Sequence, residues 1–316
     1  MTTAPGSGGL RPGFSVVVPV YNSERSLEEL YARLEATFAA MGRTFEVIFV
    51  DDCSRDGSME VLRSLHARHP GPVRALSLYR NQGQHAALMC GLQVCRGEFV
   101  VTIDDDLQHR PEDIPLLYAR LQEGYDAVFG SYPRKEGLLK SLGSRAVGRL
   151  AHRIFDPPQG LEMSAFRLIR RDVVEHVKAY RTSFPYLTGM ILSTTRRVAN
   201  ADIHHDERRY GHTGYTLPKL ISLSFNLLVN YSALPLKAMG WLGMGVSLAA
   251  FVVGVTFLVR QMVIGQAPEG WTSLVVLVSF FSGVMFAMMF VMAEYLSRLL
   301  TEVSNRPPHA VREVLD

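Results

Sequence analysis

The first third of the chain alternates short apolar runs with amphipathic segments, and this alternation constrains the fold more than any other feature. The apolar runs, rich in Val, Ile and Phe, are typical of buried strands, and the segments between them have the apolar spacing of helices. The pattern predicts strands at Phe14–Val20, Phe45–Asp52, Val73–Tyr79 and Glu98–Asp104, and helices at Leu27–Met41, Ser58–His69 and His85–Cys95. Such an order predicts an α/β fold, Rossmann-like, with a mainly parallel sheet covered by helices on both faces.

A polar loop follows each predicted strand. These loops are "YNSE" from Tyr21, "DDCSRDGS" from Asp51, "RNQGQH" from Arg80 and "DDDLQH" from Asp104. Taken singly, each loop is explained as well by an ordinary helix cap or turn as by a ligand site. Because ligands of open parallel sheets bind beyond the carboxyl ends of the strands, all four loops should meet at one edge. Four acid- or amide-bearing loops at one edge favour a ligand site.

Three consecutive carboxylates, Asp104 to Asp106, repel one another unless a cation lies among them. Side chains alternate along an extended chain, so Asp104 and Asp106 can face the same side, with Gln108 as a neutral oxygen ligand. Asp105 would then point away, toward the sugar or a neighbouring loop. Mg²⁺ or Mn²⁺ takes one or two carboxylates and completes its shell with water and substrate phosphates. The stretch therefore predicts a divalent metal site that also holds a diphosphate.

Two segments near the C-terminus, Met239–Val259 and Trp271–Ala293, contain no charged residue. Each is long enough to cross a bilayer as a helix, which takes about 20 residues. A core helix that is apolar all round is the alternative. Trp241 and Trp271 stand near the segment ends, where indole rings favour the membrane interface. The short connection between the segments predicts a transmembrane hairpin.

Positive charge predicts how the hairpin is oriented. Arg260 alone lies in the connection, whereas the outer ends are flanked by Lys219, Lys237, Arg298 and Arg306. By the positive-inside rule, both outer ends are expected on the cytoplasmic side. The predicted organisation is a flexible stretch 1–13, a cytoplasmic domain 14–216, interfacial helices 217–237, two membrane helices within 238–293 and a cytoplasmic tail 294–316. A core helix of the soluble domain is the alternative for 217–237.

Composition argues against several other classes of protein. The net charge of +3 over 316 residues is too small for a nucleic-acid footprint. Cys53, Cys90 and Cys95 are odd in number and lack metal-ligand spacing. They therefore argue against both a disulfide framework and a zinc site.

The polar motifs together resemble those of the family 2 glycosyltransferases that act on polyprenyl phosphates. The resemblance rests on "VVVPVYNSE", "VDDCSRDGS", "RNQGQHAALMCGL", "IDDDLQHRPEDI", "FRLIRR" and "HHDERRYGHTGY" ahead of the apolar hairpin. It covers roughly Phe14 to Pro308 and is strongest for the bacterial enzymes that use undecaprenyl phosphate, with dolichol-phosphate mannose synthases more distant. It implies a GT-A fold, inverting transfer from a nucleotide sugar, expected to be UDP-linked, and a polyprenyl phosphate acceptor at the bacterial inner membrane. It leaves open whether the protein is a homo-oligomer.

The resemblance also implies roles for individual residues. Donor-nucleotide contacts fall on Pro19, Tyr21, Glu24, Asp51, Asp52, Arg80, Gly83 and Asp105. The metal and diphosphate motif falls on Asp104, Asp106 and Gln108, and Arg208 of "RRYGHTGY" falls near the donor diphosphate, so that Asp104, Asp106 and Arg208 form the expected catalytic set. The acceptor phosphate is expected at Arg134, Lys140 and Ser144.

Three departures from the family pattern stand out. Asp105 replaces the usual alanine, which puts metal affinity or sugar preference in doubt. Thr213 and Gly214 replace a serine and a lysine, with Arg209 a candidate for the missing charge. Leu161, beside Glu162, stands where an acidic residue is expected, so no catalytic base is assigned.

The reaction does not require a base. A phosphate monoester has a second pKa near 6, so the acceptor is largely an anionic nucleophile at neutral pH. Two other functions fit the sequence less well. A processive polysaccharide synthase needs a membrane channel and usually a Gln-x-x-Arg-Trp motif, which this sequence lacks, and a non-catalytic scaffold would be expected to lose the acidic clusters.

Overall fold

The computed structural model describes residues 12–132, 154–180, 182, 185–204, 234–264, 270–303 and 310–316. The chain divides into two compact units. One comprises Met1–Thr216 together with Pro307–Asp316, and the other comprises Leu217–Arg306. The chain therefore leaves the first unit, passes through the second and returns to the first.

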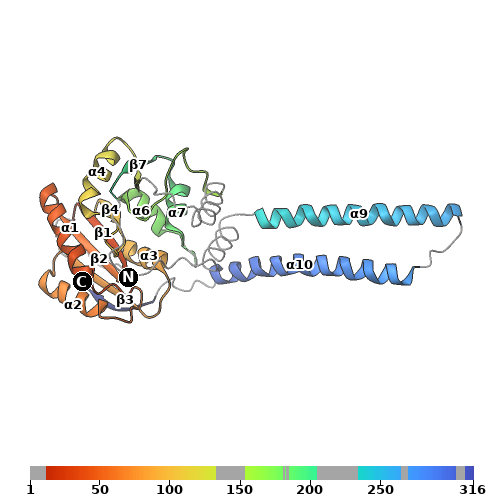
Figure 1. Ribbon diagram of the computed structural model, residues 1–316, viewed down its shortest axis with the longest axis horizontal. Coiled ribbons are helices and arrows are strands. Elements are labelled where there is room, and N and C mark those ends of the chain that lie inside the picture. The colour runs from red at the N-terminus through yellow and green to blue at the C-terminus, as the bar shows by residue number, and fades with distance from the viewer. Residues whose placement is uncertain are drawn as a thin grey trace, which may run out of the picture. The chain divides into compact units, whose positions relative to one another are not determined.

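The first unit is an α/β structure built in the predicted order (Figure 1). Its strands are β1 (Phe14–Val20), β2 (Phe45–Asp51), β3 (Val73–Leu78), β4 (Phe99–Thr102), β5 (Ala127–Ser131), β6 (Arg167–Arg170), β7 (Val198–Asp202) and β8 (Val311–Leu315). Its helices are α1 (Leu27–Met41), α2 (Ser58–Arg68), α3 (Gln84–Val94), the 3-10 turn η1 (Pro111–Asp113), α4 (Ile114–Gln122), α6 (Arg171–Lys178) and α7 (Leu187–Thr194). All seven segments predicted between Phe14 and Asp104 are confirmed, and their ends differ by two residues at most.

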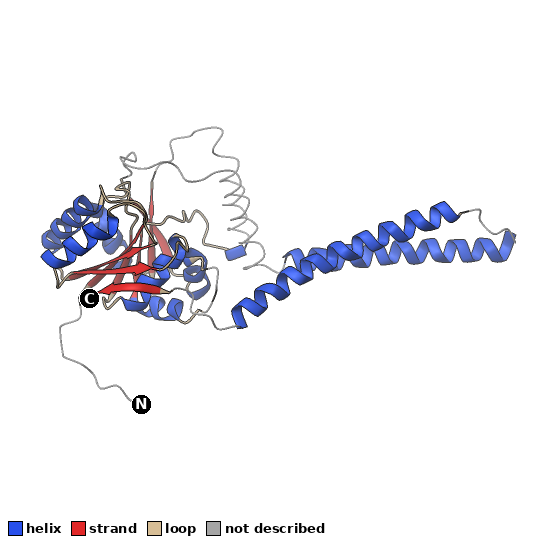
Figure 2. Cartoon of the chain, turned by 90° about the horizontal axis from the view of Figure 1, so that it is seen from below, coloured by secondary structure: helices blue, strands red, loops and turns tan. Residues whose placement is uncertain are grey.

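The strands form one sheet in the order β7-β5-β6-β4-β1-β2-β3-β8. The pairs β1–β2, β1–β4, β2–β3 and β5–β7 are parallel, whereas β6 and β8 run antiparallel to their neighbours. Helices lie on both sides of the sheet (Figure 2). The predicted α/β fold with a mainly parallel sheet is confirmed. Because β1 to β5 and β7 all point the same way, their carboxyl ends share one edge.

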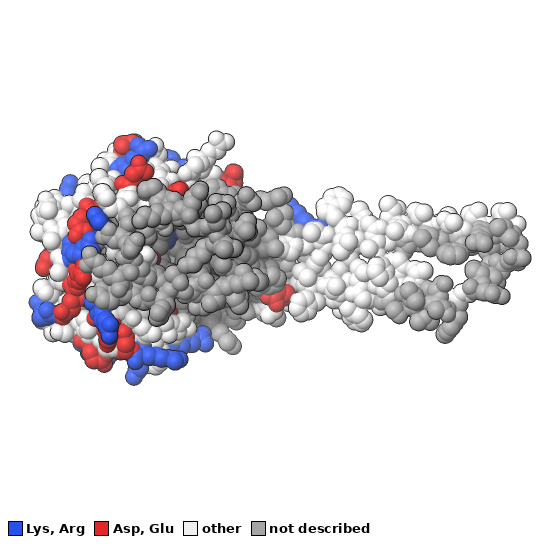
Figure 3. Space-filling view, viewed as in Figure 1, with Lys and Arg blue, Asp and Glu red and all other residues white. Residues whose placement is uncertain are grey.

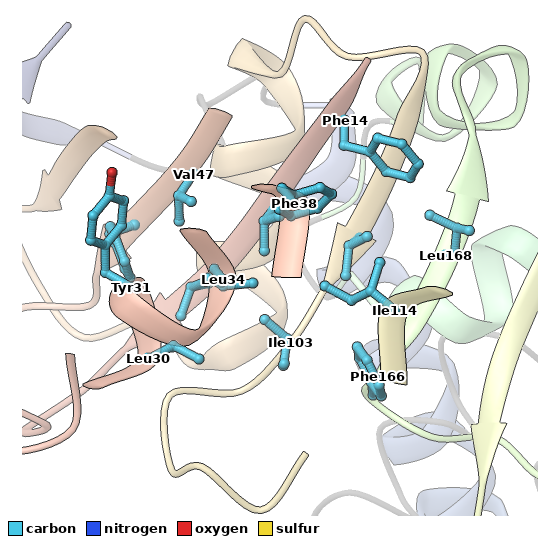
Figure 4. Close-up of a cluster of buried hydrophobic side chains, with 14 of the residues drawn as sticks. Phe14, Leu30, Tyr31, Leu34, Phe38, Val47, Ile103, Ile114, Phe166 and Leu168 are labelled. Carbon is cyan, nitrogen blue, oxygen red and sulfur yellow. The ribbon is translucent and has the colours of Figure 1, made fainter. Parts of the chain in front are cut away.

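The sheet is stable because its central strand is buried on both faces. Every residue of β1 is buried. The Phe14 ring lies 5.2 Å from the rings of Phe38, Phe99 and Tyr118, and Figure 4 shows it beside Phe38 in the cluster under α1. Full burial of one such side chain contributes about 1.5–3 kcal/mol. On the opposite face α3 packs against β1 and β2, and its buried residues run without a break from Ala86 to Leu92.

The second unit contains two long helices, α9 (Leu234–Ile264) and α10 (Trp271–Val303), which contact each other. Many of their apolar side chains are exposed, among them Trp241, Leu248, Phe286 and Phe290. Figure 3 shows few charged atoms along the described parts of these helices. One window of the described residues, Phe280–Ser297, is long and apolar enough to span a membrane, and none of it is buried.

The residues of the predicted tail, 294–316, belong to both compact units. The α10 helix continues to Val303, and Val311–Leu315 then pairs with β3 as the edge strand of the sheet. The pairing could not be read from a local pattern, because the strand is short and its partner lies far away in the sequence.

Candidate active site at the carboxyl edge of the sheet

The loops after β1 and β2 are joined by backbone-to-side-chain hydrogen bonds. Asn22 donates its N–H to Ser54 Oγ at 3.0 Å and accepts from the Arg55 N–H at 2.8 Å through its amide oxygen. Glu24 accepts from the Gly57 N–H at 2.8 Å. Asn22 itself has a φ of 54°, a conformation that asparagine tolerates better than most residues. The two loops therefore form one rigid wall of the site.

Two buried aspartates extend this wall to the third loop. Asp51 accepts a hydrogen bond from Ser77 Oγ at 3.0 Å, and the two oxygens of Asp52 accept from the N–H groups of Gln82 and Gly83, each at 2.7 Å. Burial raises the pKa of Asp52, against these two hydrogen bonds. Both carboxylates thus hold loops in place, and any nucleotide contact would use their remaining lone pairs.

The three carboxylates of the acidic loop after β4 have different hydrogen-bond partners. Asp104 is half-buried and accepts a hydrogen bond from the side-chain amide of Gln84 at the start of α3. Asp106 accepts from the backbone N–H of Gln108 at 3.2 Å. The intervening turn uses Leu107 at φ 60°, which costs energy for a branched side chain and marks a constrained loop.

Asp105 contacts the neighbouring loop after β1. Its carboxylate accepts from the Tyr21 N–H at 3.1 Å and from Ser23. Burial raises the pKa of Asp105 to about 6, while these hydrogen bonds oppose the rise. Of the two contacts expected for this residue, the structure shows the one with a neighbouring loop.

The pKa of Asp104 is raised to about 7, chiefly by burial and then by the charges of Asp106 and Asp105. A carboxylate pair of this kind is strained when both members are ionised, and a bound cation relieves that repulsion. The residues therefore fit a divalent ion held by two carboxylates and the amide oxygen of Gln108. In the part of the chain that the structure describes, no group of three or more His, Cys, Asp or Glu could hold a metal, so water and substrate oxygens would have to complete the shell.

Sequence reasoning missed Arg167, on β6. This side chain is 2% exposed, and its guanidinium donates to Thr102 Oγ1 at 3.1 Å and to Thr188 Oγ1 at 2.8 Å. No ion pair joins it to a carboxylate among the described residues, yet its charge lowers the pKa of Asp104. A buried cation with neutral partners is costly. The available signal was an arginine flanked by the apolar residues Phe166 and Leu168 in "FRLIRR".

The other donor residues predicted from the sequence lie along the same edge. Pro19 is buried in β1, and Tyr21 and Glu24 follow it on the exposed first loop. Arg80 is exposed after β3. Gly83 precedes α3 with a φ of 89°, which only glycine adopts readily. The structure thus brings these residues to one rim, whereas their contacts with a nucleotide stay predictions.

Arg134, Lys140, Ser144 and Arg208 lie outside the described residues. Their segments nevertheless begin at known points, because β5 ends at Ser131 and β7 ends at Asp202, opposite each other in parallel register. Both segments therefore start at the edge that carries the acidic loop.

Asp113 provides a second tie that sequence reasoning missed. Its buried carboxylate accepts from the backbone N–H of His204 at 2.8 Å, and it lies 2.9 Å from Nδ1 of the same ring. This bond joins "IDDDLQHRPEDI" to the first residue of "HHDERRYGHTGY". It therefore fixes the start of the basic motif against the stretch that follows the acidic loop.

Glu162, beside the position where an acidic residue was expected, is held at the end of β5. Its carboxylate accepts from Ser131 Oγ at 3.0 Å, and its backbone bonds to the side chain of Asn200 on β7. These contacts give it a clear structural role.

Comparison with known proteins agrees with this geometry. The glycosyl transferase family 2 model matches residues 15–178. The chain is 36% identical to the undecaprenyl-phosphate 4-deoxy-4-formamido-L-arabinose transferase of Pseudomonas paraeruginosa, over 95% of this chain and 90% of that protein. The protein of the same name from Shewanella sediminis is 32% identical, over 95% of this chain and 92% of the relative. The chain therefore belongs to glycosyl transferase family 2 and is an enzyme of that family. Within it, the chain is similar to transferases named for undecaprenyl phosphate, which confirms the expected resemblance.

A solved structure supports the fold. Glucosyl-3-phosphoglycerate synthase from Mycobacterium tuberculosis, crystallised with Mn²⁺, UDP and phosphoglyceric acid, matches with a TM-score of 0.52. It shares 20% identity, over 69% of this chain and 76% of that chain. The similarity identifies the first unit as a GT-A-like α/β fold.

Proposed function

We propose that the protein is a membrane-bound inverting glycosyltransferase. It transfers a sugar from a nucleotide-sugar donor, which we expect to be UDP-linked, to undecaprenyl phosphate. The transfer takes place at the cytoplasmic face of the bacterial inner membrane. The product would serve cell-envelope glycan synthesis or lipid A modification. One observation carries the proposal. The acidic loop Asp104–Asp106 lies at the same edge of a family 2 fold as three loops that are joined by hydrogen bonds.

The donor would lie across these loops. The nucleoside would contact the loops after β1 and β2, which are joined by hydrogen bonds, and the loop after β3 would lie on its other side. Asp104 and Asp106, with Gln108, would hold Mg²⁺ or Mn²⁺, which when bound supplies positive charge to the leaving diphosphate. Arg208 is proposed to add charge to the same diphosphate. The Asp113–His204 bond supports this role because it anchors the basic motif four residues before Arg208.

The acceptor phosphate needs positioning rather than deprotonation. Arg134, Lys140 and Ser144, in the segment that starts after β5, are proposed to hold the phosphate in line with the anomeric carbon. An oriented nucleophile gains much of its rate from proximity alone. Because the acceptor phosphate is already largely anionic at neutral pH, no general base is needed. Asp105 and Glu162 instead accept hydrogen bonds from Tyr21 and Ser131.

The second unit gives the lipid acceptor a matching location. Because a polyprenyl chain stays in the bilayer, an enzyme that uses its phosphate must work at the interface. The exposed apolar side chains of α9 and α10, in a pair of helices of sufficient length, support the proposed hairpin of two membrane spans at about 239–259 and 271–293. Residues 217–237 would be the interfacial helices that join it to the catalytic domain.

Release of nucleoside diphosphate tests the proposal. The full-length protein in detergent is incubated with UDP-sugars and Mn²⁺, with and without undecaprenyl phosphate. A lipid phosphate transferase releases UDP only when the acceptor is present. Release that is equal in both reactions would contradict the proposed acceptor, a soluble polymer product would indicate a processive synthase, and no release from any UDP-sugar would contradict the proposed donor class.

A further inference from the structure

The last strand of the chain lies beside the proposed donor site. Antiparallel pairing joins β8 to β3 from Ala75–Leu315 to Leu78–Val311, with an irregularity between Ser77 and Leu78. Without β8, β3 would be the exposed edge of the sheet. Edge strands have unpaired backbone groups and open more readily than central strands. The C-terminal residues thus complete a sheet whose other strands precede the second unit.

Side chains fix this strand in register. Glu313 receives two hydrogen bonds from Arg63 on α2, at 3.0 and 2.7 Å. Asp316 lies 2.5 Å from Nε of Arg74, a nearly buried side chain on β3 that also bonds to the carbonyl of Val94. A bidentate arginine–carboxylate pair specifies geometry as well as attraction. Ion pairs therefore hold the strand in register at Glu313, near its middle, and at Asp316, directly after its end.

The beginning of β8 reaches the loop that follows β3. The carbonyl of Ala310 accepts from the Tyr79 N–H at 3.1 Å. Only three residues later, Gln82 and Gly83 donate their N–H groups to Asp52. Among the described residues, the bond to Ala310 is the last backbone hydrogen bond between this edge of β3 and the C-terminal segment before the loop that engages Asp52.

We propose that β8 is a positioning element of the donor-nucleotide site, which holds the Tyr79–Gly83 loop in the conformation that engages Asp52. This inference rests on the function proposed above. It assigns the C-terminal residues a role in donor binding, although along the chain they follow the whole second unit. The nucleotide site is then completed only after the membrane segment has been made.

A charge reversal tests the proposal in the full-length protein. Glu313→Arg should speed amide exchange in Tyr79–Gly83 and weaken binding of UDP with Mn²⁺ about two- to fivefold, the range expected for one exposed ion pair. Adding Arg63→Glu should restore both measurements, because it rebuilds the pair with reversed charges. Arg68→Glu, which breaks the pair between Arg68 of α2 and Glu28 of α1, is the matched control and should change neither measurement.

Deletion of Ala310–Asp316 is the second variant and should give a larger loss of both exchange protection and UDP affinity. The proposal is overturned if the loop exchanges at the wild-type rate in the deletion variant. It is also overturned if exchange rises while UDP affinity stays at the wild-type value. Absence of binding of both UDP and GDP to the wild-type protein would count against the proposed function instead, and the exchange measurement would still decide the role of β8.

Discussion

At the scale of single residues, the acidic loop divides three adjacent carboxylates between two tasks. Asp105 is bonded to the backbone of Tyr21, and so braces the loop after β1. The negative charges of Asp104 and Asp106 repel each other, and a divalent ion bound between them would relieve this repulsion. Arg167 adds a fixed positive charge behind Asp104 from the neighbouring strand, where its hydrogen bonds to threonines hold it in place.

Asp106→Ala should abolish transfer without unfolding the protein. The change removes a proposed metal ligand, so we expect kcat to fall at least about a hundredfold. The melting temperature should change little, because Asp106 is half-buried in a loop and its carboxylate accepts from the nearby backbone N–H of Gln108. Glu112→Ala removes an exposed carboxylate from the same stretch, one that pairs with Arg33, and should keep most of the activity. Equal activity of both variants would rule out the proposed role of Asp106.

Metal affinity should depend on pH. Asp104 has a pKa of about 7, so below that pH a proton competes with the metal for the carboxylate. The affinity for Mn²⁺ without nucleotide should therefore rise from pH 5 to about 7 and then level off, with release of a proton on binding at the lower pH. Calorimetry in buffers of different ionisation enthalpy measures both quantities. A constant affinity with no proton release would contradict this assignment.

At the scale of elements, the site depends on helices that approach the sheet closely. A side-chain carbon added at Gly91 in α3 would overlap Val17 of β1 and come within 3.1 Å of Val50 of β2. The glycine therefore allows α3 to lie flat on these strands. Since α3 begins at Gln84, which holds Asp104, its position also sets the geometry of the acidic loop.

Gly91→Ala should lower the free energy of unfolding by about 1–3 kcal/mol, as overpacking of a core does. The gain in helix propensity, about 1 kcal/mol, acts in the opposite direction but is smaller than the strain. Gly71→Ala is the matched control, because that glycine has no atom within 4 Å of an added carbon. Denaturant titration of both variants gives the comparison. A Gly91→Ala variant as stable as Gly71→Ala would show that α3 can shift freely.

The segment after β5 carries the proposed acceptor contacts. Lys140→Ala should raise the apparent KM for undecaprenyl phosphate and leave the KM for the nucleotide sugar unchanged, because it removes a charge-assisted contact with only one substrate. Lys135→Ala, in the same segment but outside the proposed set, should change neither constant. Equal damage to both substrates by Lys140→Ala would indicate a structural role instead.

At the scale of the whole molecule, the chain departs from and returns to one α/β unit. A variant that replaces residues 217–309 by a Gly/Ser linker keeps β8, whereas one that ends at Thr216 lacks it. The first should bind UDP like the full-length protein yet transfer poorly to long-chain lipid in vesicles, because it loses the effective concentration that a membrane anchor provides. The second should also bind UDP less tightly. Transfer by the linker variant at the full-length rate would contradict the proposed role of the second unit.

The sequence predicts β1 to β4, half of the eight strands of the described sheet, because these strands and the helices between them have strong local patterns. The loops that follow these strands could also be predicted to lie at one edge, because the carboxyl ends of parallel strands share an edge. Three features could not be predicted, since each depends on contacts between distant segments. These are the pairing of β8 with β3, the burial of Arg167 beside the acidic loop, and the bond between Asp113 and His204. Short strands and single polar residues carry too little local signal to specify such partners.

Identification of the lipid product tests the central claim most directly. The full-length protein and Asp106→Ala are incubated with Mn²⁺, undecaprenyl phosphate and a panel of UDP- and GDP-sugars, and the extracted lipids are analysed by mass spectrometry. We predict one glycosyl unit joined through the single phosphate of undecaprenyl phosphate, formed by the wild-type protein and absent with Asp106→Ala. No glycosylated lipid from any donor, or equal amounts from both proteins, would contradict the account.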